Sequence, residues 1–310
     1  MQEIHLDKLS SDFFSKGSLI TLGNFDGIHL GHLSILEKLQ SLKAEKNLPS
    51  ILVTYYPNPA IILGKSKSHK SIYSERSKKE ILAELKIDYI LTIPFTEEFS
   101  KIKAEDFIDT ILKKKLNANH IIIGFNHFFG KDREGNFDFL KQFSVQYSFT
   151  VEKMDSIVFE KEQISSSVIR NFLQLGLVEK VSQFLNRNFH LYGKVVKGFQ
   201  RGRLIGFPTA NLQIEENIII PKIAVYAVKI FYGNENYFGM MNIGRNPTFE
   251  NQELSLEVHI FDFEKDIYDE ELRIEFIQLI REEKKFATIT ELKLQLETDS
   301  KIIRKNFSIQ

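Results

Sequence analysis

The first 185 residues alternate short apolar runs with longer amphipathic segments. The short runs are rich in β-branched and aromatic residues, which predicts buried strands at Ser18–Gly23, Ile51–Tyr56, Tyr89–Pro94, His120–Gly124 and Phe149–Met154. The longer segments have helical spacing, which predicts helices at His29–Lys46, Glu75–Lys86, Glu97–Leu116 and Glu134–Phe143. This alternation predicts a parallel sheet covered on both faces, and such sheets bind ligands beyond the carboxyl ends of their strands.

Two further helices, Ser166–Leu175 and Val178–Leu185, are expected to close this first module. After Asn186 the pattern changes to strands joined by turns, at Leu191–Val196, Ala224–Tyr232, Tyr237–Ile243, Leu256–Phe263 and Arg273–Arg281. Strands at this spacing predict an antiparallel sheet or small β-barrel, followed by a last helix at about Thr288–Lys305. We therefore expect two domains, 1–186 and 187–310.

Composition narrows the class of protein. Lys plus Arg and Asp plus Glu are balanced at 41 each, so no net charge favours DNA or an acidic membrane. The chain has no cysteine, which excludes disulfides and thiolate metal sites. It shows no leader pattern at its start and no apolar run long enough to cross a membrane. We expect a cytoplasmic protein that binds neither nucleic acid nor membrane, and weak or transient self-association is left open.

Two histidines follow the first predicted strand, within the run Thr21-Leu-Gly-Asn-Phe-Asp-Gly-Ile-His-Leu-Gly-His32. His29 and His32 are three residues apart at a helix start, so they share one face, and the helix N-terminus suits a phosphate. Gly23, Gly27 and Gly31 let backbone and ligand approach closely. Two imidazoles placed here can stabilise the charge that develops when an α-phosphate is attacked.

Two other interpretations of these histidines are open. One histidine could cap the helix while the other packs against it. A zinc site would also tolerate this spacing, with Asp26 as the only apparent third ligand.

A second phosphate-binding element is predicted at Ile164-Ser-Ser-Ser-Val-Ile-Arg170. Ser165 and Ser166 stand at a helix start, and Arg170 follows one turn later. Hydroxyls, free N–H groups and a guanidinium form a plausible clamp for the β- and γ-phosphates of a nucleotide.

The stretch from Gly193 to Leu212 holds four glycines and four basic residues between two predicted strands. Such a loop can surround phosphates with N–H groups and cations, and Gly198 and Arg203 are our candidates for this role. Thr209 and Asn211 are two apart in an extended segment, so both side chains point the same way. Their oxygens suit Mg²⁺, although a glycine-rich hairpin would have the same composition.

A general base is predicted on the strand Leu256-Glu-Val-His-Ile-Phe-Asp262. The strand period places Glu257, His259 and Phe261 on one face. Glu257 could accept a proton from an attacking alcohol if it faces a pocket, but it could also be a solvent-facing residue of an edge strand.

The first half of the chain resembles the adenylyltransferase module of bacterial bifunctional riboflavin kinase/FAD synthetases. The histidine and Ser-Ser-Ser-Val-Ile-Arg runs are similar to its two signatures, and Thr54-Tyr-Tyr-Pro-Asn-Pro59 and Ile123-Gly-Phe-Asn-His-Phe-Phe-Gly130 are similar to two intermediate motifs. The resemblance implies a Rossmann-like nucleotidylyltransferase sheet. The sequence departs from the family pattern at Asn58, where His is usual, and at Phe128. The residues expected to contact ATP are Gly23, Phe25, Asp26 and Gly31, and those expected to contact flavin are Pro57, Pro59, Asn126 and Phe129.

The second half resembles the flavokinase module of the same family. Four runs appear in the family's order: Gly-Phe-Pro-Thr-Ala-Asn, Met241–Phe249, Glu-Val-His-Ile-Phe-Asp-Phe and Ile280–Phe286. The resemblance implies that Thr209 and Asn211 serve Mg²⁺ with ATP, and that Glu257 is the base toward the riboflavin ribityl hydroxyl. Asp269 stands where the family usually has Gly, and we expect it to tolerate a positive-φ turn at modest cost.

The resemblance in both halves implies an enzyme that uses ATP to convert riboflavin to FMN and then FMN to FAD, with release of pyrophosphate. One alternative is a nucleotidylyltransferase for another phosphate acceptor, which leaves Glu257 and Gly-Phe-Pro-Thr-Ala-Asn without a role. Another is a flavin-binding or flavin-storing protein with a decayed site.

Overall fold

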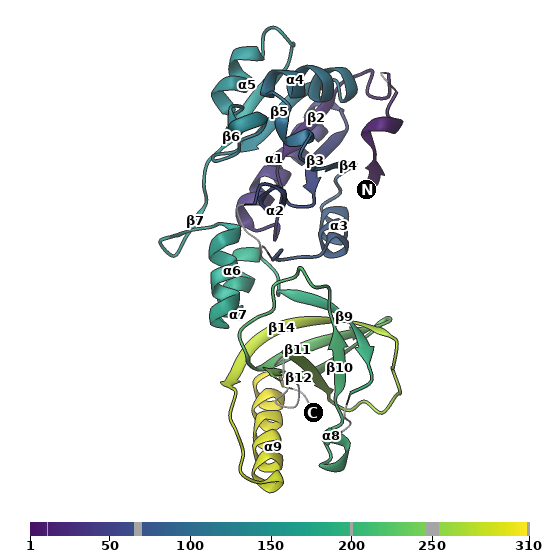
Figure 1. Ribbon diagram of the computed structural model, residues 1–310, viewed down its shortest axis with the longest axis vertical. Helices are drawn as coiled ribbons and strands as arrows, with labels where there is room; N and C mark the ends of the chain where they lie inside the picture. Colours follow the sequence, from purple (N-terminus) through teal and green to yellow (C-terminus); the bar gives the residue numbers. More distant parts are fainter. Residues whose placement is uncertain (11, 65–69, 199–200, 246–253, 309–310) are drawn as a thin grey trace. The chain divides into compact units, whose positions relative to one another are not determined.

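The computed structural model describes residues 1–10, 12–64, 70–198, 201–245 and 254–308 (Figure 1). Two predicted segments fall partly outside this range, namely residues 199–200 of the glycine-rich stretch and residues 246–249 of the Met241–Phe249 motif. The chain divides into two compact units, Met1–Ser166 and Ser167–Gln310.

A parallel sheet forms the centre of the first unit. Its strands are β1 (Gln2–Ile4), β2 (Ser18–Leu22), β3 (Ser50–Tyr56), β4 (Tyr89–Pro94), β5 (Ala118–Gly124) and β6 (Thr150–Met154), in the order β1-β4-β3-β2-β5-β6. The five strands predicted from sequence are confirmed. Strand β1 was not predicted, because three residues form no recognisable pattern. The strand order reverses between β2 and β5, which is where doubly wound sheets bind ligands.

Helices cover this sheet, and α1 (Leu30–Lys46) packs against β2 and β5. Alternate strand residues such as Ile20, Val53 and Ile121 share one apolar cluster with Phe107–Leu116. The remaining helical segments of this unit are η1 (Leu6–Lys8), α2 (Pro59–Ile62), α3 (Glu75–Glu84), η2 (Phe99–Lys101), α4 (Ala104–Phe107), the π-helical η3 (Ile108–Lys115), η4 (Lys131–Arg133) and α5 (Phe137–Phe143).

The single helix predicted at Glu97–Leu116 is wrong, because the structure breaks it at Ile102–Lys103, where the backbone is extended. The Ile102 carbonyl accepts from the N–H of Lys131, and the Glu134 carboxylate accepts from the N–H of Ala104 at 2.7 Å. Contacts with Lys131 and Glu134, which are distant in sequence, thus start a new helix, α4, at Ala104. The helix predicted at Glu134–Phe143 likewise begins later. Asn136 is its N-cap, and the side chain of Asn136 accepts from the N–H of Phe139.

The helices α6 (Ser166–Leu175) and α7 (Val178–Leu185) have the predicted bounds. A small hairpin, β7 (Val158–Phe159) and β8 (Glu162–Gln163), precedes them. They belong almost wholly to the second compact unit: α7 packs on β14, and the Leu173 carbonyl accepts from the N–H of Lys222. The predicted domain boundary after residue 186 describes modules of function, and it stays a prediction.

The second unit is a closed antiparallel barrel, as predicted. Within the described residues its ring order is β10-β13-β12-β11-β14-β9, and α9 runs beside the barrel (Figure 1). The elements are β9 (His190–Val196), α8 (Arg201–Leu204), β10 (Ala210–Gln213), β11 (Ala224–Tyr232), β12 (Glu235–Arg245), β13 (Leu254–Ile260), β14 (Glu271–Glu282) and α9 (Ile289–Asn306). Strand β10 was expected only as an extended segment.

The barrel strands differ in burial: β11 is buried on both faces from Ala224 to Val228, whereas β13 is buried on one. Leu256, Val258 and Ile260 are buried on one side of β13, while Glu257 and His259 alternate with them on the other. Helix α9 packs through Ile303 into an outer cluster with residues of β11 and β12, and burying such a side chain contributes about 1.5–3 kcal/mol. Asp269 adopts φ 64°, as expected, and pairs with Lys194 at 2.8 Å.

Candidate active sites

The predicted histidine motif lies at the carboxyl end of β2, beside the point where the strand order reverses. The segment from Gly23 to His29 connects β2 to α1, and His29 is the N-cap of that helix. The site therefore has the position that parallel sheets of this type use for nucleotides.

The connecting loop has an uncommon backbone. Phe25 (φ 49°), Gly27 (φ 86°) and Ile28 (φ 43°) all have positive φ, and Phe25 and Ile28 are buried. Such conformations cost non-glycine residues about 1–3 kcal/mol each and persist only where the surroundings hold them. A Cβ on Gly27 would lie 2.9 Å from Ile72 Cδ1, so this position also requires the absence of a side chain.

The two histidines contact each other directly. Their rings stack at 3.8 Å with 14° between the planes, and His29 is only 6% exposed. His29 Nδ1 accepts from the N–H of His32 at 3.4 Å, so the neutral ring carries its proton on Nε2. The capping interpretation thus describes His29 correctly. A Cβ on Gly31 would lie 3.2 Å from the His29 ring, which explains the glycine there.

Asp26 organises the same loop. Its Oδ1 accepts from the N–H of Ile72 at 2.8 Å, and its carbonyl accepts from Ser166 Oγ at 2.8 Å. In the described part of the chain, no three His, Asp or Glu side chains are grouped as a metal site requires.

The predicted phosphate clamp is divided between the two compact units. Ser166 Oγ donates to the Asp26 carbonyl. This bond connects the Gly23–His29 segment, which we call the histidine loop, to the residue at which α6 begins. Ser165 lies in the first unit, whereas Arg170 lies on α6 in the second. Their roles stay predictions.

The predicted flavin contacts have different surroundings. Pro57 follows a cis peptide bond, and Pro59 begins α2. Asn58, the departure from the family motif, caps that helix: its Oδ1 accepts from the N–H of Ala60 at 3.0 Å. Asn126 is exposed and stays a candidate.

Phe129, by contrast, is buried among the rings of Phe107 and Phe139, so its ring packs in the core. Its neighbours Phe125 and Phe128 are exposed, and Arg133 lies 4.3 Å from the Phe128 ring centre. Exposed aromatic rings are the better candidates for stacking on a flavin, and Phe125 was missed from sequence.

In the second unit three polar side chains form a row across neighbouring strands. Glu257 of β13 is opposite Asn211 of β10 on one side and opposite Asn242 of β12 on the other. Directly opposed residues have Cβ atoms about 4.5–5.5 Å apart. The pairing thus brings together the predicted base and the predicted Mg²⁺ ligand Asn211.

Two hydroxyls contact the Glu257 carboxylate. Ser255 Oγ donates to Oε1 at 2.9 Å, and Thr209 Oγ1 lies 3.5 Å from Oε2. Glu257, Thr209 and Asn211, which were chosen from separate motifs, therefore lie together. Ser255 was missed, although its position two residues before Glu257 places it on the same face of the strand.

The glycine-rich stretch folds against this row. A Cβ on Gly198 would lie 2.0 Å from Asn211 Nδ2, and one on Gly202 would lie 2.2 Å from the Phe207 carbonyl and 3.4 Å from Thr209 Oγ1. Backbone at Gly198 thus approaches Asn211 more closely than any side chain would allow, whereas at Gly202 the Phe207 carbonyl excludes a side chain. Arg203, on α8, is exposed.

His259 holds the segment that leads to Thr209. Its Nδ1 lies 2.7 Å from the Pro208 carbonyl, which only accepts, so Nδ1 carries the proton. Burial lowers the pKa of His259. Phe207 and Phe261 contact the ring edge-on. A neutral imidazole therefore fixes Pro208 next to Thr209.

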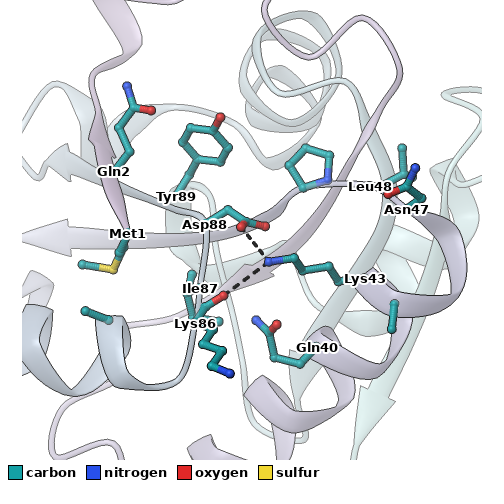
Figure 2. A pocket seen from close by; sticks show the side chains of 13 residues that line it. Met1, Gln2, Gln40, Lys43, Asn47, Leu48, Lys86, Ile87, Asp88 and Tyr89 are labelled. Carbon is teal, nitrogen blue, oxygen red and sulfur yellow. Dashed lines mark hydrogen bonds and ion pairs between the residues drawn. The ribbon is translucent and has the colours of Figure 1, made fainter.

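An open pocket lies at the opposite end of the parallel sheet, by the amino ends of β3 and β4 (Figure 2). Its lining includes Gln40, Lys43, Lys86 and Asp88. Lys43 Nζ donates to Asp88 Oδ1 at 2.6 Å and to the Lys86 carbonyl at 3.4 Å. The Lys43 cation is thus already paired, and this end of a parallel sheet is not its ligand-binding end.

Fold and sites together define an enzyme with a nucleotidyl-transfer unit followed by a phosphoryl-transfer unit. Residues 12–168 match the family model of FAD synthetase, and residues 185–307 match that of riboflavin kinase.

Curated relatives match along nearly the whole chain. The bifunctional riboflavin kinase/FMN adenylyltransferase of Buchnera aphidicola (Schizaphis graminum) is 36% identical, covering 98% of this chain and 97% of the relative. The Listeria monocytogenes protein of the same name is 34% identical with the same coverage, and that of Escherichia coli K12 is 32% identical over 95% of this chain and 94% of the relative. The chain belongs to this family of bifunctional riboflavin kinases/FMN adenylyltransferases.

A solved structure shares the whole fold. A Streptococcus pneumoniae chain described as a macrolide-efflux protein superposes with a TM-score of 0.89 at 29% identity, covering 98% of this chain and 99% of that one. Among the residues that the structure describes, none of the helices has the length and apolar character to span a bilayer.

The comparisons decide between the functional alternatives raised by the sequence. Both enzyme families are present in order, so this is a bifunctional riboflavin kinase and FMN adenylyltransferase of flavin cofactor biosynthesis. An adenylyltransferase for another acceptor would not account for the second match, and the curated relatives are named as enzymes, not storage proteins.

Proposed function

We propose that the two reactions occur at separate sites, with adenylylation beside His29 and His32 and riboflavin phosphorylation beside Glu257. The observation that supports this proposal is the division of the side chains: the stacked histidines belong to the first compact unit, and the Asn211–Glu257–Asn242 row belongs to the second. The candidate donors of one reaction and the candidate base of the other thus belong to different units, although Arg170 of the predicted phosphate clamp belongs to the second.

In the adenylyl transfer, an oxygen of the FMN phosphate attacks the α-phosphorus of ATP, and the bond to the β-phosphate oxygen breaks to release pyrophosphate. Negative charge builds up on the α-phosphate oxygens. His29 donates to them from Nε2, and His32 stacks beside it. Donors of this kind each contribute about 10²–10³-fold in rate. Ser165, Ser166 and Arg170 are the proposed grip on pyrophosphate, on grounds of sequence.

In the kinase reaction, Glu257 takes the proton of the riboflavin 5′-hydroxyl while that oxygen attacks the γ-phosphorus of ATP, and ADP leaves. Ser255 holds one carboxylate oxygen, which orients the other toward Thr209. The close approach of the Gly198 backbone to Asn211 supports the proposal that the glycine-rich stretch binds the ATP phosphates. General bases contribute about 10²–10⁴-fold in rate.

Thr209 Oγ1 and Asn211 Oδ1 are neutral oxygen donors beside a carboxylate, the kind of ligand that Mg²⁺ prefers. We assign these two side chains to Mg²⁺ carried by ATP. The bound ion would neutralise charge on the β- and γ-phosphates.

Replacing one base or donor at a time tests the separation. His29→Ala should lower FMN adenylylation about 10²–10³-fold and leave riboflavin phosphorylation unchanged. Glu257→Ala should lower riboflavin phosphorylation about 10²–10⁴-fold and leave adenylylation of supplied FMN unchanged. Chromatography of the flavins after incubation with ATP and Mg²⁺ measures both reactions. Loss of both activities from either substitution would contradict the separation.

The cellular setting is part of the same proposal. We place the enzyme in the cytoplasm. We expect no nucleic acid partner, since the basic and acidic residues balance. Light scattering at several concentrations would reveal weak or transient self-association.

A further inference from the structure

A lysine is buried below the histidine loop, and the reaction described above does not use it. Lys78 lies on α3, its side chain is 7% exposed, and its Nζ donates to Thr54 Oγ1 at 2.8 Å. It shares the buried side of the helix with Ile81 and Leu82, where an apolar residue would be usual. Burial lowers the pKa of Lys78, and the nearby carboxylates of Glu75 and Asp26 offset this in part.

The lysine is connected to the loop through one hydroxyl. Thr54, buried near the end of β3, accepts from Lys78 Nζ and donates from the same oxygen to the Asn24 carbonyl at 3.4 Å. Asn24 directly precedes Phe25, the first residue of the loop with positive φ. A single chain of hydrogen bonds therefore runs from α3 to the backbone that carries the histidines.

The segment just before α3 supports the same loop at a second point. The N–H of Ile72 donates to Asp26 Oδ1 at 2.8 Å, and the Ile72 side chain fills the space next to Gly27. The loop is thus held on one side by residues 72–78 and on the other by Ser166. Because positive φ at Phe25 and Ile28 persists only under such constraint, losing one contact should let the loop relax.

We propose that Lys78 is a positioning residue for FMN adenylylation: acting through Thr54, it holds the Asn24–Gly27 loop, and so His29 and His32, in the geometry that adenylyl transfer requires. Lys78 touches neither substrate in this proposal.

A purely structural role makes a different prediction. Taking a cation out of water is unfavourable, and the carboxylate that loses its partner when Lys78 is replaced, Glu75 at 3.7 Å, is partly exposed to water, so an apolar residue of similar volume need not destabilise the fold. Methionine is about as long as lysine and would fill the same space. A stable but slow variant would therefore separate positioning from packing.

The experiment uses the full chain with Lys78→Met, Thr54→Val and the double variant. We expect each single substitution to lower kcat for FMN adenylylation about 10-fold and to change KM for FMN and ATP less than about twofold. The reason is that the histidines lose their alignment with the reacting phosphate, while the contacts that bind the substrates remain. The double variant should be no slower than either single variant, since both remove the same connection. The midpoint of thermal unfolding should not fall for Lys78→Met.

Two controls accompany these variants. Lys79→Met changes the adjacent lysine, which pairs with Glu3 at the surface, and should leave adenylylation unchanged. Riboflavin phosphorylation, measured on the same preparations, reports the amount of folded enzyme. Thr54→Ser keeps the hydroxyl and should restore most of the rate that Thr54→Val loses, so the proposal stays testable even if Lys78→Met fails to fold.

Three outcomes would overturn the proposal. The first is a Lys78→Met enzyme with normal kcat for adenylylation. The second is a rate that falls only together with the unfolding midpoint. The third is equal loss in Thr54→Ser and Thr54→Val, which would show that the hydroxyl does not carry the effect.

Discussion

In the first unit the candidate catalytic side chains follow a loop with a strained backbone, whereas in the second unit they lie opposite one another on neighbouring strands. The loop from Phe25 to Ile28 depends on contacts from residues far away in sequence, such as Ile72 and Ser166. The row of Asn211, Glu257 and Asn242 depends on the hydrogen bonds of the barrel itself.

This difference predicts where each site is vulnerable. Loop backbone held in an uncommon conformation should respond strongly to a change of one glycine or one supporting contact. A catalytic side chain on a paired strand should instead be sensitive to changes in the side chains that contact it. Its backbone is already fixed by hydrogen bonds to the strands on both sides.

The largest effect is expected from Gly27→Ala. An alanine there must adopt φ 86° and bring its Cβ within 2.9 Å of Ile72, so the loop has to shift. A misplacement of about 1 Å can cost about 100-fold in rate, and we expect FMN adenylylation to fall by that much while riboflavin phosphorylation is unchanged. Steady-state kinetics of both reactions on one preparation measures the effect.

Gly233→Ala is the matched control in the barrel. Gly233 also has positive φ, 58°, but no described atom lies within 4 Å of the added Cβ. This variant should lose about 1 kcal/mol of stability and keep both activities. Equal loss of adenylylation in the two variants would remove the distinction between loop and strand sites.

A smaller effect is expected from acid on the second unit. His190 on β9 is buried, and burial, with the charges of Arg273 and Arg187, lowers its pKa to about 3. The unfolded chain takes up this proton near pH 6.5, and the folded barrel does so only near pH 3. Stability is therefore lost as pH falls from about 6.5 toward 3, by about 2 kcal/mol at pH 5.

His190→Gln isolates this contribution, because glutamine does not titrate. Calorimetry at pH 7 and pH 5 should show a midpoint drop that is smaller than in the unmodified enzyme by about 4–8 °C. The same drop in both proteins would show that other groups cause the acid sensitivity.

The smallest effect is expected at His259. His259→Ala removes the donor that holds the Pro208 carbonyl, and riboflavin phosphorylation should fall about 10-fold as Thr209 loses its fixed position. His259→Asn should regain most of this rate, because its amide nitrogen can take the place of Nδ1. Arg304→Met, which changes a neighbour of Phe261, is the control. No difference between the Ala and Asn variants would contradict a positioning role.

Much of the fold follows from local pattern. Tyr89–Pro94, Ala224–Tyr232 and Ser166–Leu175 have the predicted bounds, because an apolar run or an amphipathic period begins and ends with the element. The helix expected at Glu97–Leu116 failed for a non-local reason, since Glu134 caps a new helix start inside it. Strand β10 was not predicted as part of the barrel, because it follows a glycine-rich stretch and has no strand pattern of its own. It forms through pairing with β9 and β13.

The candidate sites divide in the same way. His29, Thr209 and Glu257 could be chosen from residue type and spacing, because their chemistry is local. That Asn211 stands opposite Glu257 depends on the pairing of β10 with β13, and that Lys78 supports the histidine loop depends on how α3 packs. Phe129 was chosen from its motif, its ring packs in the core, and its contact with flavin stays a prediction.

Closure of the barrel also sets the order in which the chain can fold as it is synthesised. β9 pairs with β14, where His190 lies opposite Glu275, so the ring cannot close until β14 (Glu271–Glu282) has left the ribosome. The parallel sheet is complete once Met154 has emerged. Distant pairings also form slowly, because a long loop must close before they stabilise anything. We expect the adenylylating unit to form first on the ribosome and the kinase barrel to follow as the last strands are made.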